Sequence, residues 1–137
     1  MCIRDSLFAD TILNNITLWD SRISFESVVS AAKKIGIHDF IMSLPDGYNY
    51  NVKERGVMLS QGQRQLISFL RAYIKNPSIL ILDEATSSID IETEKKIVEE
   101  INFLKGKTTM IVIAHRLSTV ENCDYVYEVK EGNIRKL

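Results

Sequence analysis

An unbroken aliphatic run, Ile79 to Leu82, is followed at once by two carboxylates, and this feature constrains the fold of the chain most. A short apolar run without polar alternation is typical of a strand buried on both faces, as found in parallel sheets that helices cover on both sides. Open parallel sheets bind their ligands at the carboxyl ends of their strands. The sequence therefore predicts an α/β fold with Asp83 and Glu84 at a ligand-binding edge.

The pattern after this strand predicts a βαβ unit. Apolar residues recur at helical spacing from about Asp90 to Phe103, and a second apolar run spans Thr108 to Ala114. A strand, a helix and a strand in this order place the two strands parallel. Two further β-prone runs, Tyr125–Val129 and Ile134–Leu137, flank Glu131-Gly132-Asn133 and predict a terminal hairpin.

The first half of the chain is predicted to be helical. Apolar residues at three- and four-residue spacing run from Ser24 to Gly36, where the glycine can end the helix, and a short second helix follows at about 39–44. Ser60, with Gln63 three residues later, forms a capping box before a third apolar stripe that ends ahead of Pro77. The tip of this third helix is therefore fixed near Ser60.

Composition narrows the function classes. The chain has 45% hydrophobic and 26% charged residues, which is ordinary for a globular protein, and its 17 basic and 18 acidic residues give a net charge of -1. That balance provides no general attraction for nucleic acid or anionic lipid. Cys2 and Cys123 lack the spacing of a metal site, which predicts a reduced, cytosolic chain. No stretch approaches the roughly 18 apolar residues that cross a bilayer, so membrane attachment is expected only through partner domains.

Four motifs in a fixed order resemble those of the ATP-binding cassette (ABC) family. Leu59–Gln63 is similar to the signature motif, Ile79–Glu84 to the Walker B strand, Ser87–Asp90 to the D-loop, and His115 to the switch histidine. The resemblance covers Leu7 to Leu137 and implies the C-terminal portion of a nucleotide-binding domain. It implies a P-loop NTPase-like (RecA-like) parallel sheet core, here truncated, with an α-helical subdomain that carries the signature motif.

The same resemblance divides the chain. Residues 7–76 correspond to the helical subdomain, and residues 77–137 to the C-terminal part of the ATPase core. Residues 1–6 do not fit the family, because the Q-loop glutamine is expected near position 3, which is Ile3. This start is interpreted as a truncation junction or an artefact of translation.

The resemblance assigns ATP and Mg²⁺ as cofactors and gives the strand ends their roles. Asp83 would hold Mg²⁺ through a coordinated water, since this ion keeps much of its hydration shell. Glu84 would orient or deprotonate the attacking water, and His115 would contact the γ-phosphate of ATP. Paired strands lie about 4.8 Å apart, so both side chains reach one phosphate if their strands are neighbours. Without the family context, His115 is equally compatible with a partly buried histidine at a strand end.

The signature segment, Ser60, Gln61, Gly62 and Gln63, is implied to contact the γ-phosphate of ATP held by a second nucleotide-binding domain. Gly62 allows close approach of the backbone, and the first-turn amides form an anion site supported by the helix dipole. Gln61 replaces the glycine of the commonest signature. The alternative for Ser60 is a simple helix N-cap.

Ser87, Ser88 and Asp90 make up the D-loop of the resemblance, where Asp90 caps the following helix, contacts the opposite subunit, or does both. Three arginines could support phosphates or the domain interface, although ordinary solvated or salt-bridged arginines are favoured. They are Arg64, Arg71 and Arg116.

Two segments resemble exporters of the multidrug or lipid type. Glu54, Arg55 and Gly56 are similar to the segment with which exporter cassettes contact their membrane domains, although Lys53 stands where many members have glycine. Leu7–Ile12 and Asn15–Ile16 resemble the exporter stretch that follows the Q-loop. The implied partners are a second nucleotide-binding domain and a transmembrane domain, and the implied location is the cytoplasmic face of the plasma (inner) membrane.

The phosphate-binding loop, Gly-x-x-x-x-Gly-Lys-Ser/Thr, has no match in this sequence. Gly106-Lys107-Thr108 imitates its end, but Ile101 stands where the first glycine is needed, and the tripeptide precedes a strand instead of following one. It is predicted to be a turn. The isolated chain is therefore expected not to hydrolyse ATP.

Three functions remain to be compared. The first is ATP hydrolysis that drives export by a full-length parent protein. The second is a non-hydrolytic module that donates its signature helix to a partner. The third is a chromosome-maintenance or repair ATPase, which is disfavoured because the coiled-coil heptads expected before the signature are missing between Leu7 and Ser60.

Overall fold

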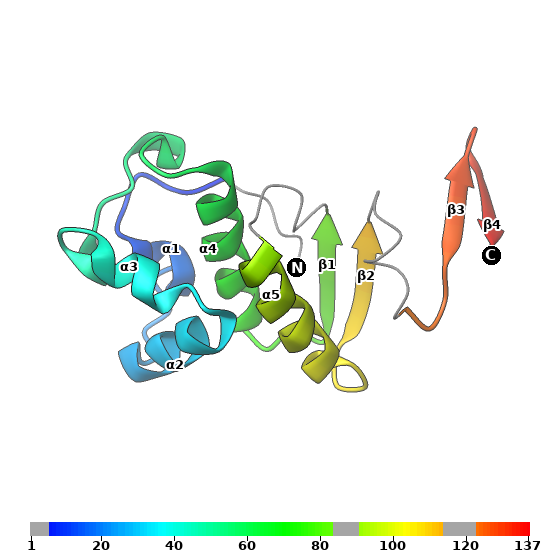
Figure 1. The fold of residues 1–137 in the computed structure, drawn as a ribbon, viewed down its shortest axis with the longest axis horizontal. Coiled ribbons are helices and arrows are strands. Elements are labelled where there is room, and N and C mark those ends of the chain that lie inside the picture. Colours follow the sequence, from blue (N-terminus) through cyan, green and yellow to red (C-terminus); the bar gives the residue numbers. More distant parts are fainter. Residues whose placement is uncertain (1–5, 84–90, 114–122) are drawn as a thin grey trace.

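The structure of the chain is a computed structural model that describes residues 6–83, 91–113 and 123–137. Figure 1 shows helices gathered at one end, a pair of strands in the middle, and a hairpin at the other end. The helical part comprises α1 (Ile12–Thr17), α2 (Phe25–Ile35), α3 (His38–Ser43), η1 (Gly47–Asn49), η2 (Glu54–Gly56) and α4 (Gln61–Tyr73). The rest comprises β1 (Ile79–Asp83), α5 (Ile91–Leu104), β2 (Thr109–Ile113), β3 (Tyr127–Lys130) and β4 (Asn133–Lys136).

Local signals define α2 at both ends. The hydroxyl of Ser24 accepts a hydrogen bond from the backbone N–H of Ser27 at 3.2 Å, which satisfies one of the unpaired donors of the first turn. Gly36 adopts a left-handed conformation with φ of 83°, and its N–H donates to the carbonyls of Ala32 and Lys33. The predicted helix from Ser24 to Gly36 is confirmed, and the expected short helix after it is α3.

One hydrophobic core joins the helices to the first strand. Burying an aliphatic or aromatic side chain contributes about 1.5–3 kcal/mol to the free energy of folding, so the residues of this core supply most of the favourable part of that free energy. The largest fully buried side chains are Ile12, Ile16, Val28, Ile35, Ile37, Ile41, Ile67, Phe69, Leu70, Leu80 and Leu82. Because the set includes residues of α1, α2, α4 and β1, the helical part and β1 pack as one body.

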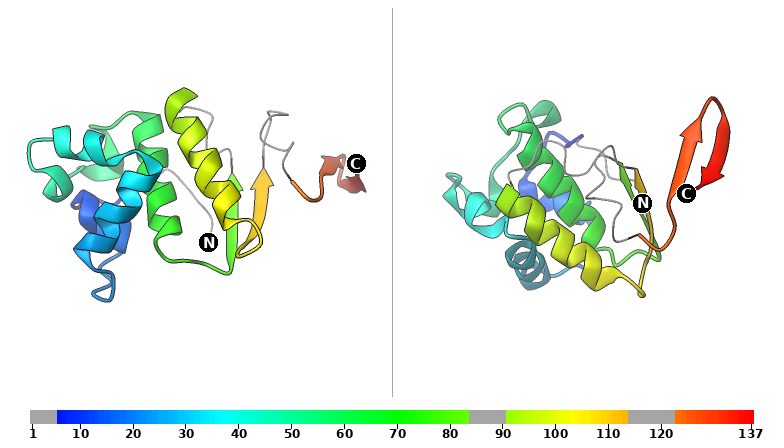
Figure 2. Two further views of the ribbon diagram at one scale, coloured as in Figure 1. Left: turned by 60° about the horizontal axis from the view of Figure 1, so that its bottom comes forward. Right: turned by 45° about the vertical axis from the view of Figure 1, so that its right-hand side comes forward.

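The predicted βαβ unit is confirmed. Strands β1 and β2 are parallel, with a register that runs from Ile79 opposite Thr109 to Asp83 opposite Ile113, and α5 connects them. The helices lie on one side of this two-stranded sheet in both views of Figure 2. The overall architecture is therefore mixed α/β with a parallel sheet, as the sequence predicts.

The expectation that the Ile79–Leu82 run is buried on both faces is wrong for this structure. Leu80 and Leu82 are buried against the helices, whereas Ile79 on the opposite face is 52% exposed. Ile111 and Ile113 of β2 are exposed beside it. The physical reason is that the described residues place a helical layer on only one face of the sheet.

The predicted terminal hairpin is confirmed, with a shorter first strand (Tyr127–Lys130) and a second strand that begins one residue earlier, at Asn133. Strands β3 and β4 are antiparallel and joined by Glu131 and Gly132, whose φ values of 49° and 79° are those of a type I′ turn. All residues of both strands are exposed, and β3 does not pair with β2, so the described strands form two separate sheets. Figures 1 and 2 show the hairpin standing apart from β2.

Gly106-Lys107-Thr108 is a turn, as predicted. The N–H groups of Lys107 and Thr108 both donate to the carbonyl of Leu104, each at 3.0 Å, and Gly106 has a φ of 80°. The tripeptide thus lies in the turn between the end of α5 at Leu104 and the start of β2 at Thr109. Among the described residues, no helix is both long and apolar enough to cross a membrane.

Candidate functional site

The capping box predicted at Ser60 is present at the start of α4. The Ser60 hydroxyl accepts the N–H of Gln63 at 3.2 Å, and the Gln63 side-chain oxygen accepts the N–H of Ser60 at 2.9 Å. The Ser60 hydroxyl keeps its own proton for a further acceptor. The helix tip therefore has two of its backbone N–H groups satisfied by the capping box and can still donate a hydrogen bond from the Ser60 hydroxyl.

The remaining signature residues occupy the first turn of α4. Gln61 is exposed and Gly62 is buried, and the first intrahelical hydrogen bond runs from Arg64 N–H to the Ser60 carbonyl at 3.0 Å. The N–H groups of Gln61 and Gly62 lie where a helix has no carbonyl of its own to offer them. Such amides, together with the helix dipole, suit an anion.

Asp83 ends β1 with its side chain exposed. The register places it beside Ile113, the last residue of β2, so both parallel strands end at the same edge. A single exposed carboxylate at a strand end fits Mg²⁺, which usually takes one or two carboxylates and several waters. Among the described residues, no three histidine, cysteine, aspartate or glutamate side chains form a metal-binding group.

Glu84 and His115 lie outside the described residues, as do Ser87, Ser88 and Asp90 of the predicted D-loop. The strands that lead to Glu84 and His115 are hydrogen-bonded neighbours. The neighbouring arrangement on which the predicted convergence depends is thus met, while the convergence itself stays a prediction. Helix α5 begins at Ile91, the residue after Asp90.

The segment of Glu54, Arg55 and Gly56 forms η2 and has an unusual backbone. Lys53, Arg55 and Gly56 all have positive φ, of 58°, 54° and 65°. Lys53, with ψ of -174°, occupies a region that is essentially restricted to glycine. The sequence shows only that lysine stands where the family often has glycine, and the backbone supplies the reason for that glycine.

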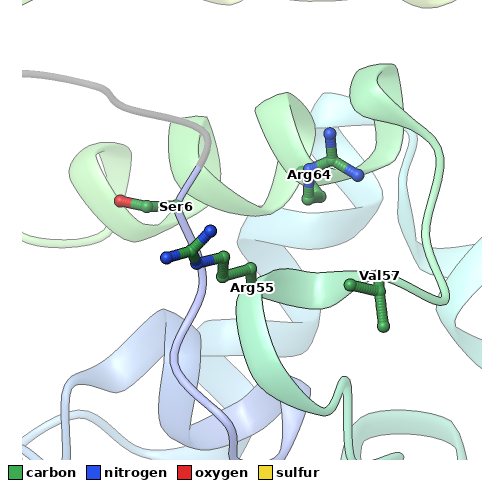
Figure 3. A pocket seen from close by; sticks show the side chains of 4 residues that line it. All are labelled: Ser6, Arg55, Val57 and Arg64. Atoms are coloured by element: carbon green, nitrogen blue, oxygen red, sulfur yellow. The ribbon is translucent and has the colours of Figure 1, made fainter.

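Gly56 is needed where it lies. A Cβ atom there would be 3.0 Å from Cδ of Arg64 and 3.1 Å from Cδ1 of Leu7. The close approach packs η2 against α4 and the N-terminal segment. Beside it lies a hollow of about 370 Å³ lined by Ser6, Arg55, Val57 and Arg64. Figure 3 shows Arg55 reaching from η2 toward the chain at Ser6, with Arg64 on α4.

Arg71 has a role that the sequence does not reveal. Its guanidinium donates to the Asn15 carbonyl at 2.7 Å, to Asn15 Oδ1 at 3.1 Å and to the Ser6 carbonyl at 3.2 Å. It also lies 5.6 Å from the centre of the Phe8 ring. Burial lowers the pKa of Arg71. The expectation of an ordinary solvated or salt-bridged arginine is wrong here, because Arg71 fastens the N-terminal segment to α4.

Lys75 acts in parallel with Arg71. Its ammonium donates to the Thr17 carbonyl at 2.9 Å and pairs with Asp20 at 3.2 Å. Thr17 is the last residue of α1, where unpaired carbonyls favour a cation. Arg71 and Lys75, which both follow the signature segment, thus donate to backbone carbonyls in the last turn of α1. Nothing in the spacing of these residues reveals such distant partners.

The chain was also compared with known proteins. The sequence model of the family described as "ABC transporter" matches residues 5–87. A Staphylococcus aureus (strain NCTC 8325 / PS 47) protein described as a multidrug export ATP-binding/permease protein is 48% identical over 128 residues, which cover 93% of this chain and 22% of that protein. Its counterpart in strain bovine RF122 / ET3-1 is 47% identical over the same length.

A solved structure agrees in fold. The structure described as a bacterial Atm1-family ABC exporter with ATP bound matches with a TM-score of 0.87 and 41% sequence identity. The match covers 96% of this chain and 23% of that one. The chain thus spans about a fifth of the length of the relatives it matches.

Proposed function

Because the chain belongs to the ABC transporter family, we propose that it forms part of the ATPase domain of an exporter, in which ATP hydrolysis drives transport across a membrane. The observation that carries the proposal is the parallel register of β1 and β2. It places Asp83 and Ile113, the last residues of the two strands, side by side at one edge of the sheet. That edge is where open parallel sheets bind ligands.

Three residues near this edge carry the hydrolytic chemistry. Mg²⁺, when bound, offsets the negative charge of the phosphates. Asp83 would hold the ion, Glu84 would orient or deprotonate the attacking water, and His115 would contact the γ-phosphate. Phosphoryl transfer depends mainly on positioning and charge, so few side chains are required.

The signature tip serves a second nucleotide-binding domain. Ser60, Gln61, Gly62 and Gln63 offer a hydroxyl and first-turn amides to the γ-phosphate of ATP bound by that partner. The capping box supports this role because it holds the tip in place before ATP arrives. Ser87, Ser88 and Asp90 contact the partner beside it. The partner is an identical or a different cassette, and no nucleic acid takes part.

Glu54, Arg55 and Gly56 connect the ATPase domain to the membrane domain of the same transporter, at the cytoplasmic face of the plasma (inner) membrane. Their exposed charges and the fixed, glycine-dependent backbone of η2 support this assignment. Residues 7–76 act as the helical subdomain and residues 77–137 as the C-terminal part of the ATPase core.

The test is ATP hydrolysis by the full-length protein that contains this chain. Glu84→Gln should lower kcat by about two to four powers of ten, the contribution typical of a general base. Glu99→Gln, which neutralises an exposed carboxylate of α5, is the matched control and should leave the rate unchanged. Equal rates in Glu84→Gln and the parent protein would reject the role of Glu84.

A second function is proposed for the isolated chain. Without a phosphate-binding loop sequence, it would donate its signature helix to a partner and not hydrolyse ATP itself. Among the described strands, β2 pairs only with β1 and β3 only with β4. This separation supports the proposal, since in the family the phosphate-loop strand lies between the counterparts of β2 and β3. Robust magnesium-dependent hydrolysis by purified residues 1–137 would refute it.

A further inference from the structure

Asn15 is the centre of a buried polar cluster that joins the N-terminal segment, α1 and α4. Its side chain is fully buried. The side-chain oxygen accepts from the Phe8 N–H at 2.8 Å and from Nη2 of Arg71 at 3.1 Å. The side-chain NH₂ group donates to the carbonyls of Phe8 and Thr11, each at 3.0 Å. The polar atoms of Asn15 are therefore satisfied by groups from three parts of the fold.

Arg71 provides the directional contacts between this cluster and α4. Its guanidinium also donates to the Asn15 carbonyl at 2.7 Å and to the Ser6 carbonyl at 3.2 Å, and the planar fork of an arginine fixes the direction of such bonds. The apolar contacts of α4, through Ile67 and Leu70 among others, are not directional. Crossing angles of packed helices scatter by about 15–20°. The hydrogen bonds of Arg71 therefore restrict the tilt of α4 more closely than its apolar packing does.

The signature tip lies at the other end of the same helix. Helix α4 is continuous from Gln61 to Tyr73, with Ser60 as its N-cap. Arg71 follows Ser60 by eleven residues, which corresponds to about 16 Å along the helix axis. A tilt of about 5° around Arg71 would displace the tip by about 1.4 Å over that length. A misplacement of about 1 Å in a catalytic arrangement can reduce the rate by about a hundredfold.

We infer that Arg71 is a positioning residue for ATP hydrolysis, because its contacts to Asn15 and Ser6 set the tilt at which the signature tip meets the γ-phosphate of the partner's ATP. The inference rests on the proposed function of the signature segment and goes beyond it, since Arg71 acts through α4 and not by contact with ATP. Lys75 does not replace this contribution, because it lies beyond the end of α4 and carries a flexible ammonium instead of a planar fork.

Steady-state ATP hydrolysis by the full-length protein that contains this chain tests the inference. Arg71→Ala should lower kcat by about ten- to a hundredfold and change KM for ATP by less than about threefold, because the tip is misplaced while the partner still holds its ATP. Arg71→Lys keeps the charge but loses the fork, so its kcat should be intermediate. Guanidinium ions at about 10 mM, far below a denaturing concentration, should restore part of kcat in Arg71→Ala and leave the parent protein unchanged.

Ile41→Ala is the matched control for a loss of stability alone. Ile41 is fully buried in α3, and its side chain has no polar atom. This variant should lower the urea midpoint but leave kcat unchanged at a temperature where circular dichroism shows every variant to be folded. An equal loss of kcat in Ile41→Ala and Arg71→Ala would show that the rate follows stability, and would overturn the positioning role.

The remaining outcomes separate this inference from the proposed function. Hydrolysis that is lost in Glu84→Gln but retained in Arg71→Ala would reject the positioning role alone. If Arg71→Ala does not fold, the parent's kcat in folded Arg71→Lys would reject that role equally. A parent protein without magnesium-dependent hydrolysis would reject the proposed function, and this inference with it.

Discussion

Replacing Lys53 with glycine should stabilise the chain, although it removes every side-chain contact at that position. The φ of 58° and ψ of -174° at Lys53 are strained by its Cβ atom, at a cost of about 1–3 kcal/mol. Glycine relieves this strain but gains conformational freedom in the unfolded chain, which offsets about 0.4–1 kcal/mol. The net increase in the free energy of unfolding is therefore about 1 kcal/mol.

The backbone interactions around Lys53 should survive the change. Its N–H donates to Asn51 Oδ1 at 2.9 Å, and glycine retains that donor. Lys53→Ala is the matched control, because it removes the charge and the long side chain but keeps the Cβ atom. The alanine variant should therefore have nearly the stability of the parent chain, and only glycine should exceed it.

Urea unfolding followed by circular dichroism at 222 nm measures the difference. With an m value of about 2 kcal/mol/M, a gain of about 1 kcal/mol raises the midpoint by about 0.5 M. If alanine raises the midpoint as much as glycine, the cause is the lysine side chain and not the backbone. If glycine leaves the midpoint unchanged or lowers it, the argument from strain is wrong.

Three further predictions concern residues that pack near or on α4 and α3. Ser68 is buried and its hydroxyl has no hydrogen-bond partner, so Ser68→Ala should raise the free energy of unfolding by about 1 kcal/mol, measured by urea unfolding. Arg71→Ala should lower the free energy of unfolding by about 3 kcal/mol because charged hydrogen bonds to Asn15 are lost, and Arg71→Lys should retain part of the stability. An unchanged urea midpoint in Arg71→Ala would contradict the role of Arg71 in fastening the N-terminal segment to α4. Burial raises the pKa of Tyr48 to about 12, so its neutral form stabilises the fold below pH 10 and this contribution is lost as pH rises through 12. Absorbance titration of Tyr48 against a Tyr48→Phe control measures that pKa, and titration near 10 would refute the prediction.

Local sequence rules determined several elements of this protein. The capping box at Ser60, the glycine end of α2 at Gly36 and the Gly132 hairpin turn each depend on residues a few positions apart. Such elements are predictable because their hydrogen bonds close within one turn of chain. The βαβ unit was predictable for a related reason, since two apolar runs separated by one helix have few ways to pair.

The candidate site was predictable in part. The sequence indicated which residue types follow the first strand. The structure supplied the register of β1 and β2, in which both strands end at the same edge of the sheet. The segment before the signature showed a lysine in a glycine position, and its backbone angles show why glycine belongs there. The roles of Glu84 and His115 remain predictions based on the family resemblance.

Only the tertiary structure decided which distant groups meet. Arg71 binds Asn15 and Ser6, which lie 56 and 65 residues away in sequence, and no periodicity connects them. The one-sided burial of β1 likewise depends on which layers surround the sheet and not on the strand's own residues. Local patterns encode helices and turns because the hydrogen bonds of these elements join residues that are close in sequence. Packing instead brings together groups that are far apart in sequence, and nothing in the sequence between them indicates that they meet.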